Sequence, residues 1–234
     1  IAGFLGEYAL AKTAINKAIQ YFKEADIPEF LGEAILQKGK LLYSWSKNGQ
    51  PQYYKPAINA FQDALKVFKR DVFPQKFADV HHDLALIYSE IPVMPDEKPI
   101  WTAFCASSFK EVLAFYTKEE HPYGYAMCCH NYATALLGFP EAKLNDNLKK
   151  AAYFFEEALF VRTAVDYPME RAITLLNKLE MEWLLHNENP LEEKERLALM
   201  EEHVEEIKKL VNDGGLLLKV KDHENRLEKL KAII

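Results

Sequence analysis

The sequence predicts an all-α protein, built as a solenoid of stacked helical hairpins. Four prolines stand at nearly equal intervals, Pro28, Pro74, Pro122 and Pro168, so that the spacings are 46, 48 and 46 residues. Each proline separates two amphipathic segments, and these segments align in register across the four units. A fixed period of this kind is typical of stacked repeats, whose extended surfaces favour binding over catalysis.

The segment before each proline carries apolar residues at steps of four and three, which places them on one helix face. In the second unit these residues are Ala57, Phe61, Ala64 and Phe68. The equivalent residues elsewhere are Ala11, Ile15, Ala18 and Phe22; Cys105, Phe109, Val112 and Tyr116; and Ala151, Phe155 and Ala158. We therefore expect a helix whose small residues let neighbouring helices approach, while a large side chain fills the gap.

The segment after each proline is also expected to be a helix, because proline suits the first turn, where an N–H has no intrahelical partner. A small residue follows four positions later in every unit: Gly32, Ala78, Ala126 and Ala172. A second small residue follows eleven positions after the first three prolines, at Gly39, Ala85 and Ala133, whereas the fourth unit has Leu179.

These residues resemble the tetratricopeptide repeat, in which helix A packs through small residues on a helix B that carries alanines and an aromatic residue before a proline. Asp83-Leu84-Ala85 with Tyr88 fits helix A, and the segment from Ala57 to Pro74 fits helix B. The period is longer than the usual one of about 34 residues. The segment from Glu157 to Pro168 is similar to long-period bacterial arrays. The resemblance covers residues from about 8 to 187 and implies a right-handed solenoid of about four such hairpins.

The C-terminal part differs, and we expect a repeat domain over residues 1–187 followed by capping helices over residues 188–234. Asn189-Pro190 predicts a helix start, with Glu192 placed to complete a capping box. A helical stripe then runs from Leu197 to Val211, and Asp213-Gly214-Gly215 is expected to stop that helix. A last amphipathic segment carries Leu227, Leu230 and Ile234.

The composition excludes several classes of protein. A formal net charge of −6 argues against a general nucleic-acid binder, which normally carries a basic face. No stretch approaches the roughly 18 apolar residues of a membrane span. The three cysteines lack the spacing of a disulfide framework, which predicts reduced thiols and a cytoplasmic location.

The resemblance also implies a binding surface, because in tetratricopeptide arrays the A helices line a concave groove. We therefore expect the protein to be a scaffold that binds a peptide or a partner protein there. The groove positions singled out are Tyr43, Asp79, His82, Asp83, Met127, His130, Asn131, Asn177, Glu180 and Trp183. Among these, Tyr43, Asn131, Asn177 and Trp183 are the expected anchors. Histidine and leucine stand where chaperone adaptors of the family need cations, so capture of a peptide carboxylate is not expected.

No arrangement of residues predicts a catalytic site, a metal site or a cofactor, and we do not expect an enzyme. His82 and His130 occupy equivalent positions in adjacent units, so two facing histidines could make binding weaken near pH 6. Cys128 and Cys129 are adjacent and lack the spacing of zinc ligands.

Two alternatives stay open at this point. One is a regulatory or sensor domain that belongs to a larger multidomain bacterial protein and controls an attached or associated effector. The run Leu216 to Leu218 favours it as a surface on which another domain docks. The other is self-assembly into a homo-oligomer through stacking of the units.

Overall fold

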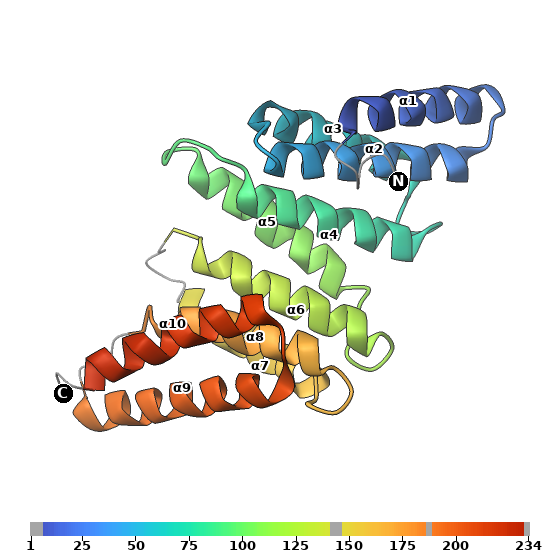
Figure 1. Ribbon diagram of the computed structural model, residues 1–234. Helices are drawn as coiled ribbons and strands as arrows, with labels where there is room; N and C mark the ends of the chain where they lie inside the picture. Colours follow the sequence, from blue (N-terminus) through green and yellow to red (C-terminus); the bar gives the residue numbers. More distant parts are fainter. Residues whose placement is uncertain (1–6, 141–146, 186–188, 232–234) are drawn as a thin grey trace. The chain divides into compact units, whose positions relative to one another are not determined.

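The computed structural model describes residues 7–140, 147–185 and 189–231, and over these residues the chain is all-helical, with no strand (Figure 1). The all-α prediction is therefore confirmed. The helices are α1 (Tyr8–Glu24), α2 (Pro28–Lys47), the 3-10 turn η1 (Pro51–Tyr53), α3 (Tyr54–Val67), α4 (Pro74–Glu90), α5 (Lys98–Leu113), α6 (Pro122–Leu137), α7 (Asn147–Val161), α8 (Pro168–Glu182), α9 (Pro190–Leu210) and α10 (Gly214–Lys231). None of the described helices has the combined length and apolar character that crossing a bilayer requires.

Each of the four evenly spaced prolines is the first residue of a helix, as the spacing predicted. Pro28, Pro74, Pro122 and Pro168 begin α2, α4, α6 and α8, which we call the A helices. The residue before each of them adopts a non-helical conformation, with φ from −112° at Ile27 to −138° at Tyr167. This fits the steric restriction that proline places on its predecessor.

The chain forms two compact units, Ile1–Tyr116 and Thr117–Ile234. In the first unit α2 packs on α1 and α3, and α4 packs on α3 and α5. In the second unit α7 packs on α6 and α8, and α9 packs on α8 and α10. Neighbours in sequence are thus neighbours in space, and the expected capping helices α9 and α10 belong to the second unit.

The small residues of α2 make room for the aromatic side chains of α3 and the segment after it. A Cβ atom at Gly39 would lie 2.6 Å from the ring of Phe61, and one at Gly32 would lie 2.8 Å from Cζ of Phe68. Phe61 and Phe68 are completely buried. Because real Cβ atoms do not approach other atoms this closely, glycine at both positions is a consequence of ring packing.

The predicted stripes of α3, α5 and α7 are buried, whereas that of α1 is not. Phe61, Phe109 and Phe155 have no exposed surface. In contrast, no residue of α1 is buried, and the stripe from Ala11 to Phe22 is only half-covered. The physical reason is that, among the described helices, α1 packs on α2 alone, while α3 packs on both α2 and α4.

The C-terminal turn signals act partly as expected. The side chain of Asn189 accepts a hydrogen bond from the backbone N–H of Leu191 at 3.0 Å, and its amide donates to Glu192 Oε1 at 3.2 Å. The prediction that Asp213-Gly214-Gly215 stops α9 was wrong. That helix ends before an extended Val211, and Asp213 Oδ1 accepts the backbone N–H of Leu216 at 2.8 Å, so this segment starts α10. Ile234 lies outside the described residues.

Candidate functional site

In the first unit the predicted groove residues Tyr43, Asp79, His82 and Asp83 lie on the adjacent helices α2 and α4, and ion pairs join these two helices. Lys40 Nζ lies 3.5 Å from Asp83 Oδ2, and Lys76 Nζ lies 2.7 Å from Glu33 Oε2. We call the surface formed by Glu33, Gln37, Lys40, Tyr43, Asp79, His82 and Asp83 the first A face. Two ion pairs therefore hold the two helices of this face in register.

Tyr43 and Asp79 of the first A face are both engaged in strong hydrogen bonds. The hydroxyl of Tyr43 donates to Glu90 Oε2 at 2.6 Å, and Lys47 Nζ lies 2.9 Å from the same oxygen. The hydroxyl of Tyr116 donates to Asp79 Oδ1 at 2.5 Å. Burial and the neighbouring carboxylates raise the pKa of both phenols above the usual value, so both remain donors.

Asp83 is the least satisfied carboxylate of the first A face. Burial raises the pKa of Asp83 to about 6, although Lys40 acts in the opposite direction. Its Oδ2 atom is buried and accepts no hydrogen bond from the described part of the chain, and Lys40 Nζ lies 3.5 Å away in a long ion pair. A buried carboxylate oxygen without a hydrogen bond is costly, which agrees with the raised pKa of Asp83.

In the second unit His130 joins α6 to α8, and its contacts define one tautomer. Arg162 Nη1 donates to Thr174 Oγ1 at 2.7 Å, while Thr174 donates to the carbonyl of Glu170 at 2.7 Å. The hydroxyl proton of Thr174 is thus used, so His130 Nδ1, 3.2 Å from Thr174 Oγ1, is the donor in that contact.

The other ring nitrogen of His130 accepts from the amide of Asn177. The distance between Asn177 Nδ2 and His130 Nε2 is 3.4 Å, and the same amide nitrogen also donates to Thr134 Oγ1 at 3.1 Å. We call Met127, His130, Asn131, Thr134, Asn177, Glu180 and Trp183 the second A face. Met127 and Asn131 are half-buried on α6.

Burial lowers the pKa of His82 and of His130 to about 4. His82 packs edge-on against the ring of Phe109, with 6.4 Å between the centroids. Neither histidine therefore titrates near pH 6, and the expected weakening of binding at that pH has no basis in these two residues.

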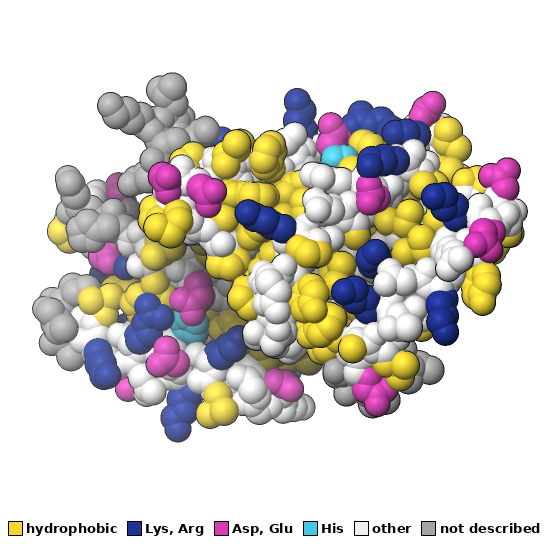
Figure 2. Space-filling view, turned by 90° about the horizontal axis from the view of Figure 1, so that it is seen from above, with side chains coloured by type: hydrophobic (Ala, Val, Ile, Leu, Met, Phe, Trp, Pro, Cys, Tyr) yellow, Lys and Arg dark blue, Asp and Glu magenta, His cyan; other side chains and the backbone are white. Residues whose placement is uncertain are grey.

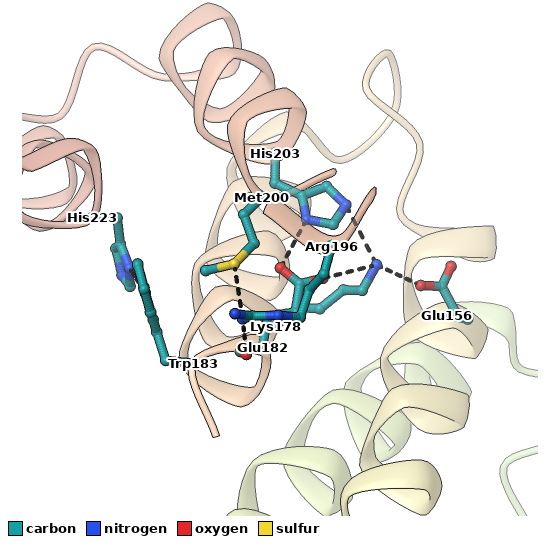
Figure 3. Close-up of polar contacts among 8 residues, drawn as sticks. All are labelled: Glu156, Lys178, Glu182, Trp183, Arg196, Met200, His203 and His223. Carbon is teal, nitrogen blue, oxygen red and sulfur yellow. Dashed lines mark hydrogen bonds and ion pairs between the residues drawn. The ribbon is translucent and has the colours of Figure 1, made fainter. Parts of the chain in front are cut away.

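Part of the second A face is covered by α10. Trp183 Nε1 donates to His223 Nδ1 at 2.8 Å, and Figure 3 shows the two side chains next to each other. The guanidinium carbon of Arg226 lies 4.1 Å from the centre of the Trp183 ring, and Glu180 Oε1 lies 3.2 Å from His223 Nε2. Trp183 also packs against the apolar core shared by α8, α9 and α10. The side chain of the expected anchor Trp183 is thus already in contact with α10.

The run from Leu216 to Leu218 is only partly the exposed surface that the sequence suggested. Leu216 and Leu217 pack partly against the core of the second unit, whereas Leu218 is 72% exposed. Helix geometry explains the difference, because three consecutive residues of α10 point in three directions.

A charged network lies buried between α8 and α9, and sequence reasoning did not find it (Figure 3). Lys178 Nζ lies 2.7 Å from Glu156 Oε1 and 3.6 Å from Glu182 Oε1. His203 contacts Glu182 and Lys178: its Nδ1 lies 3.3 Å from Glu182 Oε2, and its Nε2 lies 3.4 Å from Lys178 Nζ. Glu182 is only 2% exposed.

One feature of the sequence could have indicated this network. Glu182 stands fourteen residues after its proline, where the other A helices carry Leu42, Tyr88 and Leu136. A charge at a repeat position that is otherwise apolar indicates a paired, buried group.

The cysteines are buried thiols. Burial raises the pKa of Cys105 and of Cys129 to about 12, and raises that of Cys128 well above its ordinary value. These thiols therefore stay protonated, which disfavours metal binding. Within the described ranges, no group of three or more histidine, cysteine or carboxylate side chains is arranged to hold a metal ion.

The surface seen in Figure 2 mixes basic and acidic side chains with exposed hydrophobic ones, and no extended area of one charge sign stands out on that face. No protein-family model matches the chain, and comparisons with curated proteins and with solved structures find no match either.

Proposed function

We propose that this protein is an interaction module of the tetratricopeptide kind, a right-handed solenoid of about four hairpins that binds a partner protein or an extended peptide on its A helices. Support comes from the four A helices that begin at evenly spaced prolines. The packing of Gly39 on Phe61 and of Gly32 on Phe68 supports it further, because it reproduces the small-on-aromatic contact of such hairpins. A preformed helical surface binds without the cost of ordering the receptor.

Asp83 is the observation that carries the proposal. It lies on the first A face with an elevated pKa and an oxygen that accepts no hydrogen bond. The Asp83 side chain is 18% exposed, so a backbone N–H of an extended peptide, or a cationic side chain of a partner, can reach its exposed part, whereas Oδ2 itself stays buried beside Lys40. The neighbouring carboxylates Glu33 and Asp79 make the same surface favourable for a donor-rich ligand.

The two A faces are not equal in this proposal. Trp183 and Glu180 of the second face contact α10, so a ligand there would have to displace that helix. The polar residues of the first A face are engaged in side-chain pairs, such as Lys40 with Asp83, and these pairs can exchange for contacts with a ligand. We therefore assign the main binding site to the first A face, with Asn131 and Asn177 in a secondary role.

The proposal is tested by affinity capture with cross-linking, comparing the wild type with Asp83→Asn and with Tyr43→Phe. Asp63→Asn is the matched control, because Asp63 is an exposed carboxylate of α3 that pairs with Lys66. We expect some partner proteins to be captured by the wild type and by Asp63→Asn but not by the two variants of the first A face. An Asn131→Ala, Asn177→Ala double variant probes the second A face separately. Identical partners for all variants would exclude both A faces as the binding surface.

A further inference from the structure

The first unit carries a furrow between α3 and α5, on the side of α4 that faces away from Asp79. Its cavity has a volume of about 310 Å³. The floor is formed by Ile58 and Tyr88, which are 5% and 8% exposed. Asp79 and Tyr88 are nine residues apart on α4, which is about half a turn of difference in direction. The furrow is therefore separate from the first A face.

One wall of the furrow is aromatic. The ring centroids of Tyr88 and Trp101 are 5.7 Å apart, those of Tyr88 and Phe104 are 5.6 Å apart, and those of Trp101 and Phe104 are 6.0 Å apart. Phe104 is 45% exposed. Three rings in mutual contact, one of them nearly half exposed, form a surface on which a further aromatic side chain can pack.

The opposite wall offers hydrogen-bond donors and a positive charge. Lys55, Asn59 and Gln62 lie on one face of α3 and line the cavity, and all three are exposed. Gln62 Nε2 donates to the hydroxyl of Tyr88 at 3.4 Å, which leaves the hydroxyl proton of Tyr88 for another acceptor. No carboxylate lines this cavity, and Lys55 has no ion-pair partner within the described part of the chain.

A second cavity on the other flank of α3 extends the positive charge. It has a volume of about 440 Å³, shares Asn59 with the first, and is lined by Lys12 and Lys38. Its single lining carboxylate, Asp63, pairs with Lys66 at 2.6 Å. In a chain with a net charge of −6, three lysines thus gather along α3. Charge complementarity favours an acidic ligand at this place.

We propose that the α3–α5 furrow binds a short acidic peptide in extended conformation, with an aromatic side chain held between Tyr88, Trp101 and Phe104 and a carboxylate near Lys55. Lys55 and Gln62 are about 10 Å apart along the helix axis, which matches about three residues of extended chain. The exposed walls favour a peptide over a small molecule, because small-molecule sites bury most of the ligand surface.

The test uses the whole chain and fluorescence anisotropy with the labelled peptide Gly-Glu-Glu-Gly-Phe-Gly-amide. We expect binding that weakens as KCl is raised, since exposed charges are screened. A peptide with alanine in place of phenylalanine, and one with lysines in place of the glutamates, are each expected to bind about tenfold more weakly or worse. Equal binding of all three peptides, or no binding of the first at millimolar concentration, would overturn the proposal.

Variants locate the site. Lys55→Glu and Phe104→Ala are expected to weaken binding of the first peptide about tenfold. Lys110→Glu and Ile100→Ala are the matched controls, because both residues are exposed on α5 and do not line the cavity. Circular dichroism and urea unfolding check that each variant is folded. Loss of binding in the controls as well, or unchanged binding in Lys55→Glu and Phe104→Ala, would place the peptide elsewhere.

A structural readout separates this furrow from the first A face. The indole N–H signal of Trp101, assigned in an NMR spectrum by its loss in Trp101→Phe, is expected to shift on addition of the peptide. Asp83→Asn is expected to leave that shift and the peptide affinity unchanged. If Asp83→Asn abolishes peptide binding while the Trp101 signal stays fixed, the peptide binds the first A face and the furrow is not its site.

Discussion

The indole nitrogen of Trp183 donates a hydrogen bond to Nδ1 of His223, with 2.8 Å between the two atoms. Because an indole N–H can only donate, Nδ1 of His223 carries no proton, and the neutral ring presents Nε2–H to Glu180 Oε1 at 3.2 Å. Burial lowers the pKa of His223, against the opposing effect of Glu180. This contact ties α10 to α8 in one protonation state.

The first prediction is that acidification loosens α10. With a folded-state pKa below the unfolded value of about 6.5, neutral His223 contributes its full stability above that value, and the contribution is lost as the pH falls from there. We expect the opening free energy of α10, measured by hydrogen exchange, to fall between pH 7.5 and pH 5. His223→Gln, which stays neutral, is expected to lose this dependence. A wild type and a Gln variant with equal pH profiles would contradict the assignment.

The second prediction concerns Asp83. Its folded-state pKa of about 6 exceeds the unfolded value of about 3.8, so ionisation destabilises the fold above pH 6 and has no effect well below pH 4. We expect Asp83→Asn to raise the free energy of unfolding at pH 7.5 by about 1–3 kcal/mol relative to wild type. That gain should shrink as the pH falls from about 6 to about 4. Urea unfolding at three pH values measures it, and a gain independent of pH would refute the burial argument.

The third prediction tests the packing of α2 on α3. Gly39→Ala raises helix propensity by about 1 kcal/mol, yet the new Cβ would lie 2.6 Å from the Phe61 ring. We expect the steric clash to outweigh the gain in helix propensity, so that the free energy of unfolding falls by about 1–3 kcal/mol. The double variant Gly39→Ala, Phe61→Leu should lose less than the sum of the two single changes. Additive losses in thermal or urea unfolding would show that the contact does not decide the residue at position 39.

The fourth prediction concerns the buried pair Lys178 and Glu182. Lys178→Met leaves Glu182 charged at 2% exposure with His203 as its remaining side-chain partner, and we expect a loss of about 3–5 kcal/mol. Replacing both residues, as Lys178→Met with Glu182→Leu, should cost much less, since no charge is left unpaired. A double-mutant cycle by urea unfolding measures the coupling. A double variant as unstable as the single one would contradict this account. Lys66→Met, at the exposed pair with Asp63, is the control and should change stability by less than about 1 kcal/mol.

Much of the fold could be predicted because its determinants are local. Pro28 and Pro168 favour the first turn of a helix, since the effects of the proline ring and of its absent N–H act within one turn. The pairing of Gly39 with Phe61 could be expected from the alternation of small and large residues at repeat positions. In contrast, the local sequence at Asp213 is compatible with the end of one helix or the start of the next. In the structure Asp213 Oδ1 accepts the backbone N–H of Leu216, so the segment starts α10.

The candidate site could be predicted only in part. The repeat register placed Tyr43 and Asp83 on adjacent A helices. The structure agrees, because Tyr43 of α2 contacts Glu90 of α4, and Asp83 of α4 contacts Lys40 of α2. The repeat register did not predict the hydrogen bond from the indole of Trp183 to His223 of α10, because α10 is not part of the repeat. The aromatic furrow at Trp101 and Phe104 was also hidden, since Phe104 lies off the stripe of α5 and the approach of Tyr88 to both rings depends on the packing of α4 on α5.

The amino-acid sequence alone determined the helical class, the starts of the A helices and the core stripes, because periodicity and proline chemistry act over a few residues along the chain. Only the tertiary structure decided how the polar groups are buried and paired. Asp83 keeps an oxygen without a hydrogen bond, and Trp183 is taken by its own chain. The reason is that burial and pairing depend on residues distant in sequence, whose approach is set by helix packing rather than by local propensity.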